Sequence, residues 1–184
     1  MADITFEVDG ETFLAHRLVV CARSPVFKEE LLGEMIESKM NRIRIKDIKP
    51  AIFKAMLHFM YTDSLPDMSH EDIQLVTLVQ YLLEAADIYA LDGLKMICEE
   101  RLIRDLSLDI VTSSLALAEE HNCSELKDAC IDFASEPEIL VQLALKAEYV
   151  QLMQRYPSLL NIFDVHVRRN VDFCNLVSKK QRTN

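Results

Sequence analysis

A group of metal-binding residue types lies between positions 121 and 130, where His121 and Cys123 are followed by Cys130. Histidine nitrogens and cysteine thiolates are the ligands that zinc prefers, and four ligands usually complete a structural site. Here the ligand count falls short, the usual paired spacing is absent, and Cys130 falls on the apolar stripe of a predicted helix. We therefore interpret these thiols as buried structural cysteines.

Motifs for phosphate binding and for nucleophilic catalysis are also missing from the sequence. The chain holds three glycines and contains neither GxxxxGK[ST] nor GxGxxG, so the usual phosphate-binding loops are absent. No serine lies in a nucleophile-elbow sequence. His16 and His58 lie in strongly apolar neighbourhoods, where packing or hydrogen bonding is the ordinary role of the side chain. We predict a protein that is not an enzyme and that needs no cofactor and no metal.

The residues best suited to recognising another molecule are Met35, Ile36 and Glu37, which interrupt a polar connection between two predicted elements. Apolar side chains beside an acid on an exposed connection are what a protein-docking surface needs. Two interpretations remain open from the residues alone. Either these side chains contact a partner, or they fold back under the preceding helix, since methionine often fills gaps in a core.

The elements on either side of this connection are a helix and a strand. Ser24-Pro25 predicts the helix start, because a capping hydroxyl is followed by proline at the first helical position. Gly33 is the expected stop. After Arg42 the apolar period becomes two, with Ile43 and Ile45 on one face, which predicts a half-buried strand. The expected apolar stripe of the helix is Val26, Phe27, Leu31 and Leu32.

The N-terminal residues predict a β-hairpin. Ile4, Phe6 and Val8 alternate with polar residues, and a second run follows at 11–16. Asp9-Gly10 between the runs is a strong hairpin signal, because a type I′ turn requires positive φ at both central residues. The short apolar run at residues 17–22 fits a helix or a strand, since periodicity does not separate the two at this length.

Helical patterning dominates the rest of the chain. A helix is expected from Pro50 to about Asp63, and Ser69 with Asp72 resembles a capping box before the next one. The apolar stripe of that next helix is Leu75, Leu78, Val79, Leu82, Ala86 and Tyr89. From Leu91 onward the chain is expected to be all helical. The first of these helices is expected to carry Leu94, Ile97, Leu102 and Ile103. Ser107 and Ser124 are expected to cap the next two helices. Two further helices are expected at residues 138–154 and 157–167.

Length, charge and cysteine usage narrow the functional classes. A chain of 184 residues fits one domain or two small ones, and half of its residues are apolar, which argues against disorder through most of its length. A net charge of -10 argues against nucleic acid and against an anionic membrane surface. No apolar run approaches the roughly 20 residues that cross a bilayer, and no secretory signal is visible. Five unclustered cysteines fit reduced thiols, so we expect a cytoplasmic or nuclear protein.

Several sequence blocks, in order and at sensible distances, resemble a BTB/POZ domain. They are DITFEVDGETFLAHR, CARSPVFKEEL, EMIESKMNRIRIKDI, FKAMLHFMYTD and LLEAADIYALDGLK. The stretch LSLDIVTSSLALAEEHNCSELKDACIDF then resembles the 3-box and BACK helices that follow BTB in ubiquitin-ligase adaptors, most like the MATH–BTB (speckle-type POZ, plant-type) branch. The resemblance implies an α+β fold. A small β-sheet flanked by helices would form a BTB/POZ domain at 1–104, followed by an all-helical 3-box/BACK-like region at 105–167 and a polar, disordered tail at 168–184.

The resemblance also implies a partner. In that family the BTB domain binds cullin-3, and the connection between helix and strand carries a hydrophobic-x-Glu motif. Met35-Ile36-Glu37 occupies that place, so Met35 would fill a pocket on the cullin and Glu37 would accept hydrogen bonds. Tyr61 and Asp63 match the neighbouring contact surface of the family, although Tyr61 fits a core aromatic equally well.

Family members also pair into homodimers or heterodimers. Asp3 and Arg17 stand at the positions of a buried charged pocket in the dimer interface, and the ordinary alternative for them is a surface ion pair worth under about 1 kcal/mol. This chain begins just before the first predicted strand, so the MATH domain and the N-terminal interface helix of the family are expected to be missing. Apolar surface around Val19 and Val20 is then expected to be exposed, which weighs against dimerisation by the usual route.

Three functional interpretations follow. The first, which we predict, is an adaptor-type interaction module that binds cullin-3 in a ubiquitin ligase, with the substrate-binding domain absent. The second is a BTB scaffold for self-association or co-repressor recruitment without a ligase role. Such proteins usually carry a DNA-binding region and lack 3-box helices, and neither feature fits. The third, a small metal-dependent or thiol enzyme, needs a bound metal or a cysteine of depressed pKa.

Overall fold

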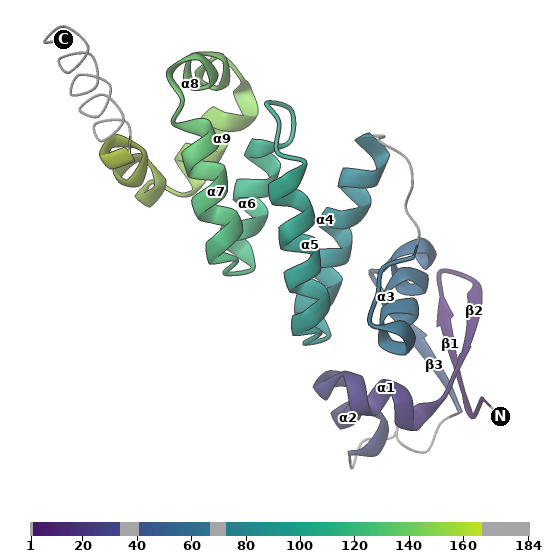
Figure 1. Cartoon of the computed structure of the whole chain (residues 1–184). Coiled ribbons are helices and arrows are strands. Elements are labelled where there is room, and N and C mark those ends of the chain that lie inside the picture. The colour runs from purple at the N-terminus through teal and green to yellow at the C-terminus, as the bar shows by residue number, and fades with distance from the viewer. Residues whose placement is uncertain (1, 34–40, 67–72, 167–184) are drawn as a thin grey trace, which may run out of the picture. The chain divides into compact units, whose positions relative to one another are not determined.

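The computed structural model describes residues 2–33, 41–66 and 73–166 (Figure 1). They belong to two compact units, Met1–Arg101 and Leu102–Asn184, each with buried apolar side chains of its own. No helix within these described residues is long and apolar enough to cross a lipid bilayer. The polar tail expected at 168–184 lies outside them, as do Ser69 and Asp72 of the expected capping box.

Within its described residues, the first unit opens with a three-stranded sheet in the order β2-β1-β3. Its strands are β1 (Ile4–Val8), β2 (Glu11–Ala15) and β3 (Arg42–Ile45). β1 and β2 are antiparallel and meet at Asp9 and Gly10, whose φ angles are 45° and 85°. Both angles are positive, as a type I′ turn requires, so the predicted hairpin is confirmed. β3 lies parallel to β1.

One face of this sheet is buried against helices. The inward side chains of β1 and β3 are at most 6% exposed, which confirms the alternation predicted for both strands. At the centre, the ring of Phe6 lies 5.2 Å from the rings of Phe27 and Phe53. Phe27 comes from α2 (Pro25–Leu32) and Phe53 from α3 (Pro50–Thr62), so three aromatic rings join the sheet to both helices.

The ambiguous run after the hairpin is a helix, α1 (Arg17–Arg23). It buries Val20 completely and leaves Leu18 74% exposed, while Val19 is half-buried. The expectation of exposed apolar surface at Val20 is therefore wrong, because the helical turn directs Val20 into the core and Leu18 outward.

Ser24 begins α2 as predicted. Its hydroxyl accepts a hydrogen bond from the backbone N–H of Phe27 at 3.1 Å, and a proline follows in the first turn. The predicted apolar stripe is too wide, because Phe27 and Leu31 are buried but Val26 and Leu32 are exposed. Gly33 ends the helix in an extended conformation, where a Cβ atom would collide with the backbone oxygen of Glu29.

Helices α4 (Ile73–Ile88) and α5 (Asp92–Arg104) follow α3. α4 packs on α3, and the predicted stripe is confirmed at Val79, Leu82 and Ala86, which are at most 1% exposed. Beyond the end of α4, the ring of Tyr89 stacks on that of Phe27 with centroids 4.6 Å apart. On α5 the fully buried residues are Leu94, Cys98 and Leu102, whereas Ile97 and Ile103 are half-buried.

The second unit is helical. Its helices are α6 (Val111–Glu120), α7 (Ser124–Ala134), α8 (Pro137–Ala144) and α9 (Ala147–Arg155), and a further helix begins at residue 158. α6 packs against α7 and α9, and α8 also contacts both α7 and α9. The prediction that Ser107 and Ser124 are N-caps is wrong. The N-caps are Ile110 and Cys123, whose backbones enter the helices without a side-chain capping bond.

The single helix expected at 138–154 is also wrong, because the chain breaks between α8 and α9. Lys146 takes an extended conformation there, with φ at -86° and ψ at 130°. Its Nζ donates to the carbonyl oxygen of Leu108 at 2.9 Å and lies 3.1 Å from a carboxylate oxygen of Asp109. These long-range contacts compete with helical continuation and hold the break in place.

Candidate protein-docking surface

Met35, Ile36 and Glu37 lie outside the described residues, so their contact with a partner remains a prediction. The helix end from which their connection departs is described. Nη1 of Arg17 donates to the carbonyl oxygen of Leu31 at 2.9 Å, in the last turn of α2. A cation at a helix C-terminus satisfies an otherwise unpaired carbonyl and opposes the helix dipole. The last turn of α2, which precedes this connection, is therefore held by Arg17.

Tyr61 lies in the last turn of α3 with 43% of its surface exposed, so it is not a core aromatic. Its hydroxyl accepts a hydrogen bond from the backbone N–H of His16 at 2.8 Å. The same oxygen lies 2.9 Å from Nδ1 of His16, and the two rings meet edge-on with centroids 6.0 Å apart. Tyr61 thus presents part of its ring to solvent while its hydroxyl is held from within the chain.

Asp63 is the C-cap of α3 and adopts the left-handed conformation at φ 55°. Its carboxylate pairs with the guanidinium of Arg23, which also lies over the ring of Phe59 at 5.5 Å. The Asp63 side chain is 70% exposed, so this ion pair contributes at most about 1 kcal/mol. Tyr61 and Asp63 are thus both exposed at the C-terminal end of α3.

An apolar groove of about 560 Å³ borders Tyr61. It is formed by β2, α3, α4 and the segment that ends at Pro66, and its lining includes Leu14, Leu57, His58, Tyr61, Pro66 and Leu78. Leu14 is 70% exposed. An exposed tyrosine beside an apolar groove is suited to a protein contact, because an aromatic ring buries a large area at low entropic cost.

Asp3 and Arg17, predicted at a dimer interface, also lie together. A carboxylate oxygen of Asp3 accepts the backbone N–H of Arg17 at 2.7 Å, and this hydrogen bond lowers the pKa of Asp3 below its ordinary value of 3.8. Asp3 is exposed in this chain, and Val19 follows two residues after Arg17. The contact fixes the start of β1 to the start of α1.

The thiols considered as zinc ligands are deeply buried. Cys130 has no exposed surface, and burial raises the pKa of its thiol to about 12. The thiol of Cys123 contacts the carbonyl oxygen of His121 at 3.7 Å. Within the described ranges, no three metal-binding side chains converge on one point. A high pKa and full burial are properties of a structural thiol rather than of a nucleophile.

Two residues that support this surface were not predicted from the sequence. His16 precedes the first residue of α1 and Arg23 is its last, so the two ends of one helix hold Tyr61 and Asp63. His16 and Tyr61 are 45 positions apart, and Arg23 and Asp63 are 40 apart. For His16, the only sequence signal of a hydrogen-bonding role was a polar side chain within an apolar run.

Comparison with known families identifies both halves of the chain. Residues 1–106 match the BTB/POZ domain, and residues 110–161 match the BPM/SPOP BACK domain. The chain belongs to the BTB/POZ family. These matches confirm the predicted resemblance, including the α+β BTB fold and its helical BACK extension. They also support a role of this BTB/POZ chain as a protein-interaction module.

Its curated relatives carry a MATH domain in their names. BTB/POZ and MATH domain-containing protein 3 of Arabidopsis thaliana is 42% identical over an alignment of 164 residues, and the match covers 86% of this chain and 40% of the relative. BTB/POZ and MATH domain-containing protein 4 of the same plant is 42% identical over an alignment of 167 residues, and the match covers 86% of this chain and 35% of the relative. This BTB/POZ chain therefore spans well under half the length of these relatives.

Among solved structures, the BTB domain of zebrafish PATZ1 is similar with a TM-score of 0.44 and 23% identity, over 56% of this chain and 76% of that chain.

The boundaries predicted for this BTB/POZ chain at residues 104 and 167 remain predictions.

Proposed function

We propose that this chain is a non-enzymatic adaptor module that binds cullin-3 in a ubiquitin ligase of the cytoplasm or nucleus. The observation that supports this most is the order of its two family matches, a BTB/POZ domain at 1–106 and a BPM/SPOP BACK domain at 110–161. The same order resembles that of ubiquitin-ligase adaptors. In this proposal, the helical half of the chain brings further partners to the ligase.

The docking surface has two parts in this proposal. On the connection between α2 and β3, Met35 fills an apolar pocket of the cullin, Ile36 lies beside it, and Glu37 accepts hydrogen bonds. Tyr61 and Asp63 form the second part. Support for the second part comes from the exposed ring of Tyr61 beside the apolar groove and from the exposed carboxylate of Asp63.

Titration calorimetry of the full chain with a cullin-3 N-terminal fragment tests this proposal. The double variant Met35→Glu with Glu37→Ala should weaken binding by at least about 30-fold, because truncating a central contact typically costs about 2 kcal/mol or more. The matched control is Leu145→Glu with Glu148→Ala, which makes equivalent changes at two exposed positions of the second unit. Equal affinity of the docking variant and the wild type would refute the proposal.

Pairing with a second BTB chain is a separate part of the proposal. Leu18, which lies between Arg17 and Val19 on α1, is 74% exposed and would be covered by a partner. Light scattering should then give twice the mass of the 21.2 kDa chain, and Leu18→Glu should return it to that of one chain. If the wild type has the mass of one chain, the proposed dimerisation is refuted, and the proposed binding to cullin-3 is unaffected.

A further inference from the structure

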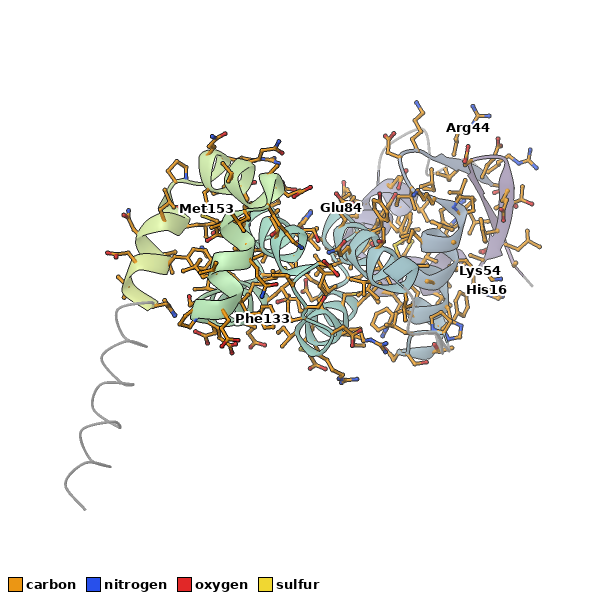
Figure 2. All side chains as sticks on the ribbon, turned by 90° about the horizontal axis from the view of Figure 1, so that it is seen from above. His16, Arg44, Lys54, Glu84, Phe133 and Met153 are labelled. Atoms are coloured by element: carbon orange, nitrogen blue, oxygen red, sulfur yellow. The ribbon has the colours of Figure 1, made fainter. Side chains whose placement is uncertain are left out.

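We infer that His16 is a positioning residue for the docking surface, acting through the hydroxyl of Tyr61. This inference rests on the proposed function, and it adds to the surface a residue that lies outside the predicted docking set. His16, labelled in Figure 2, precedes α1, whereas Tyr61 lies in the last turn of α3. Two groups of one residue therefore converge on one oxygen atom of another element.

The first of these contacts fixes part of the proton arrangement. The backbone N–H of His16 lies 2.8 Å from the Tyr61 oxygen and can only donate to it. One lone pair of the phenol oxygen is thereby used. The phenol has a single proton of its own, which still needs an acceptor.

The second contact supplies that acceptor. Nδ1 of His16 lies 2.9 Å from the same oxygen. If Nδ1 carried a proton, two donors would point at the phenol oxygen and the phenol proton would turn away from the imidazole. If Nδ1 is bare, the phenol proton is donated to it and both contacts are satisfied. The arrangement that pairs the phenol proton within the chain is therefore the tautomer with a bare Nδ1 and its proton on Nε2.

This arrangement has a consequence for what a partner meets at Tyr61. The phenol proton is used inside the chain, so the exposed side of the hydroxyl offers a lone pair and the ring offers its apolar face. A partner group facing the oxygen must therefore donate a hydrogen bond, as a lysine or a backbone N–H does, and a carboxylate is disfavoured there. The fixed ring also loses less side-chain entropy on docking than a freely rotating one.

Substitutions of His16 can separate this role from simple packing. The side-chain oxygen of asparagine can replace Nδ1 as an acceptor, whereas that of glutamine lies one carbon further out. In calorimetry with the full chain and a cullin-3 N-terminal fragment, His16→Gln should weaken binding about three- to tenfold, the range expected for one net hydrogen bond. His16→Asn should stay within about twofold of wild type. All variants should show cooperative unfolding like that of the wild type.

A double-mutant cycle gives the decisive comparison. Tyr61→Phe should cost at least as much as His16→Gln, because it also removes the oxygen to which the partner donates. Adding His16→Gln to Tyr61→Phe should cause no further loss, because the contact between the two side chains is already broken. Additive losses, or wild-type affinity for His16→Gln, would overturn the inference while the wild type still bound cullin-3. A wild type that does not bind cullin-3 would refute the proposed function, and the docking role of His16 with it.

Nitrogen NMR of the His16 side chain supplies a readout that needs no partner. The wild type should show the tautomer protonated at Nε2, and Tyr61→Phe should shift it toward the mixture of a solvent-exposed histidine. A proton on Nδ1 in the wild type would contradict the inferred arrangement even if binding were normal.

Discussion

The hydroxyl of Ser24 joins the start of α2 to the end of α4. It donates to the carbonyl oxygen of Tyr89 at 2.7 Å, across 65 positions of the chain, and it accepts the N–H of Phe27 at 3.1 Å. Ser24 has no exposed surface. The residue that caps α2 thus also makes a tertiary contact, because one buried oxygen serves both elements.

Replacing Ser24 with alanine should lower the free energy of unfolding by about 1–3 kcal/mol, because a helix N–H and a buried carbonyl each lose a partner. Urea denaturation followed by circular dichroism measures the change. Ser107→Ala is the control, since Ser107 is exposed and should change stability by less than about 0.5 kcal/mol. Equal stability of the two variants would show that the Ser24 contact contributes nothing.

Ala90 ends α4 in the left-handed conformation, with φ at 51°. The next residue, Leu91, donates its N–H to the carbonyl oxygen of Ala86 at 2.8 Å, the longer bond of a Schellman motif. Ala90→Gly should raise the free energy of unfolding by about 1 kcal/mol, because glycine has no Cβ to oppose this conformation. Ala116→Gly makes the same change within α6 and should lower stability by about 0.5–1 kcal/mol. A loss of stability for both variants would contradict the strain at Ala90.

The Asp3 carboxylate should contribute to stability in a pH-dependent manner. The hydrogen bond from the N–H of Arg17 lowers its pKa below 3.8 in the folded chain, so the contribution is present above 3.8 and is lost as the pH falls through the folded value. Asp3→Asn should therefore melt at a lower temperature than the wild type at pH 7, and the difference should shrink in acid. A difference in Tm that stays constant down to pH 2 would exclude this linkage.

Cys130 should be protected from thiol reagents in the folded protein. Burial raises its pKa from 9.0 to about 12, so almost no thiolate forms near neutral pH. Maleimide labelling followed by mass spectrometry should leave Cys130 unmodified until urea unfolds the chain. The raised pKa also means that the stability contributed by Cys130 is present below pH 9.0 and is lost as the pH rises toward 12. Labelling at equal rates in native and unfolded protein would show that the thiol is accessible.

Local signals in the sequence were sufficient for the elements that support the docking surface. Asp9-Gly10 fixed the hairpin because few residues adopt two successive positive φ angles, and Ser24-Pro25 fixed a helix start through capping chemistry. Ile43 and Ile45 predicted a buried strand face correctly, since strand periodicity is simple. In each case the physical cause lies within a few residues of its effect.

Contacts between distant residues were not predictable in the same way. The hydrogen bonds between His16 and Tyr61 depend on how α1 meets α3, and the break at Lys146 depends on its contact with Leu108. The outward position of Leu32 follows from which side of α2 meets the core, and a stripe of four apolar residues does not determine that. Tertiary packing decided these features, so they emerge only once the fold is assembled.

The parallel pairing of β3 with β1 has a consequence for synthesis on the ribosome. β1 is the central strand, and its partner on one side begins only at Arg42, after α1 and α2 have been made. A nascent chain that has not reached β3 leaves the hydrogen-bonding groups of one edge of β1 unpaired. During that interval the hairpin exposes an unpaired edge of the kind that promotes association with other chains.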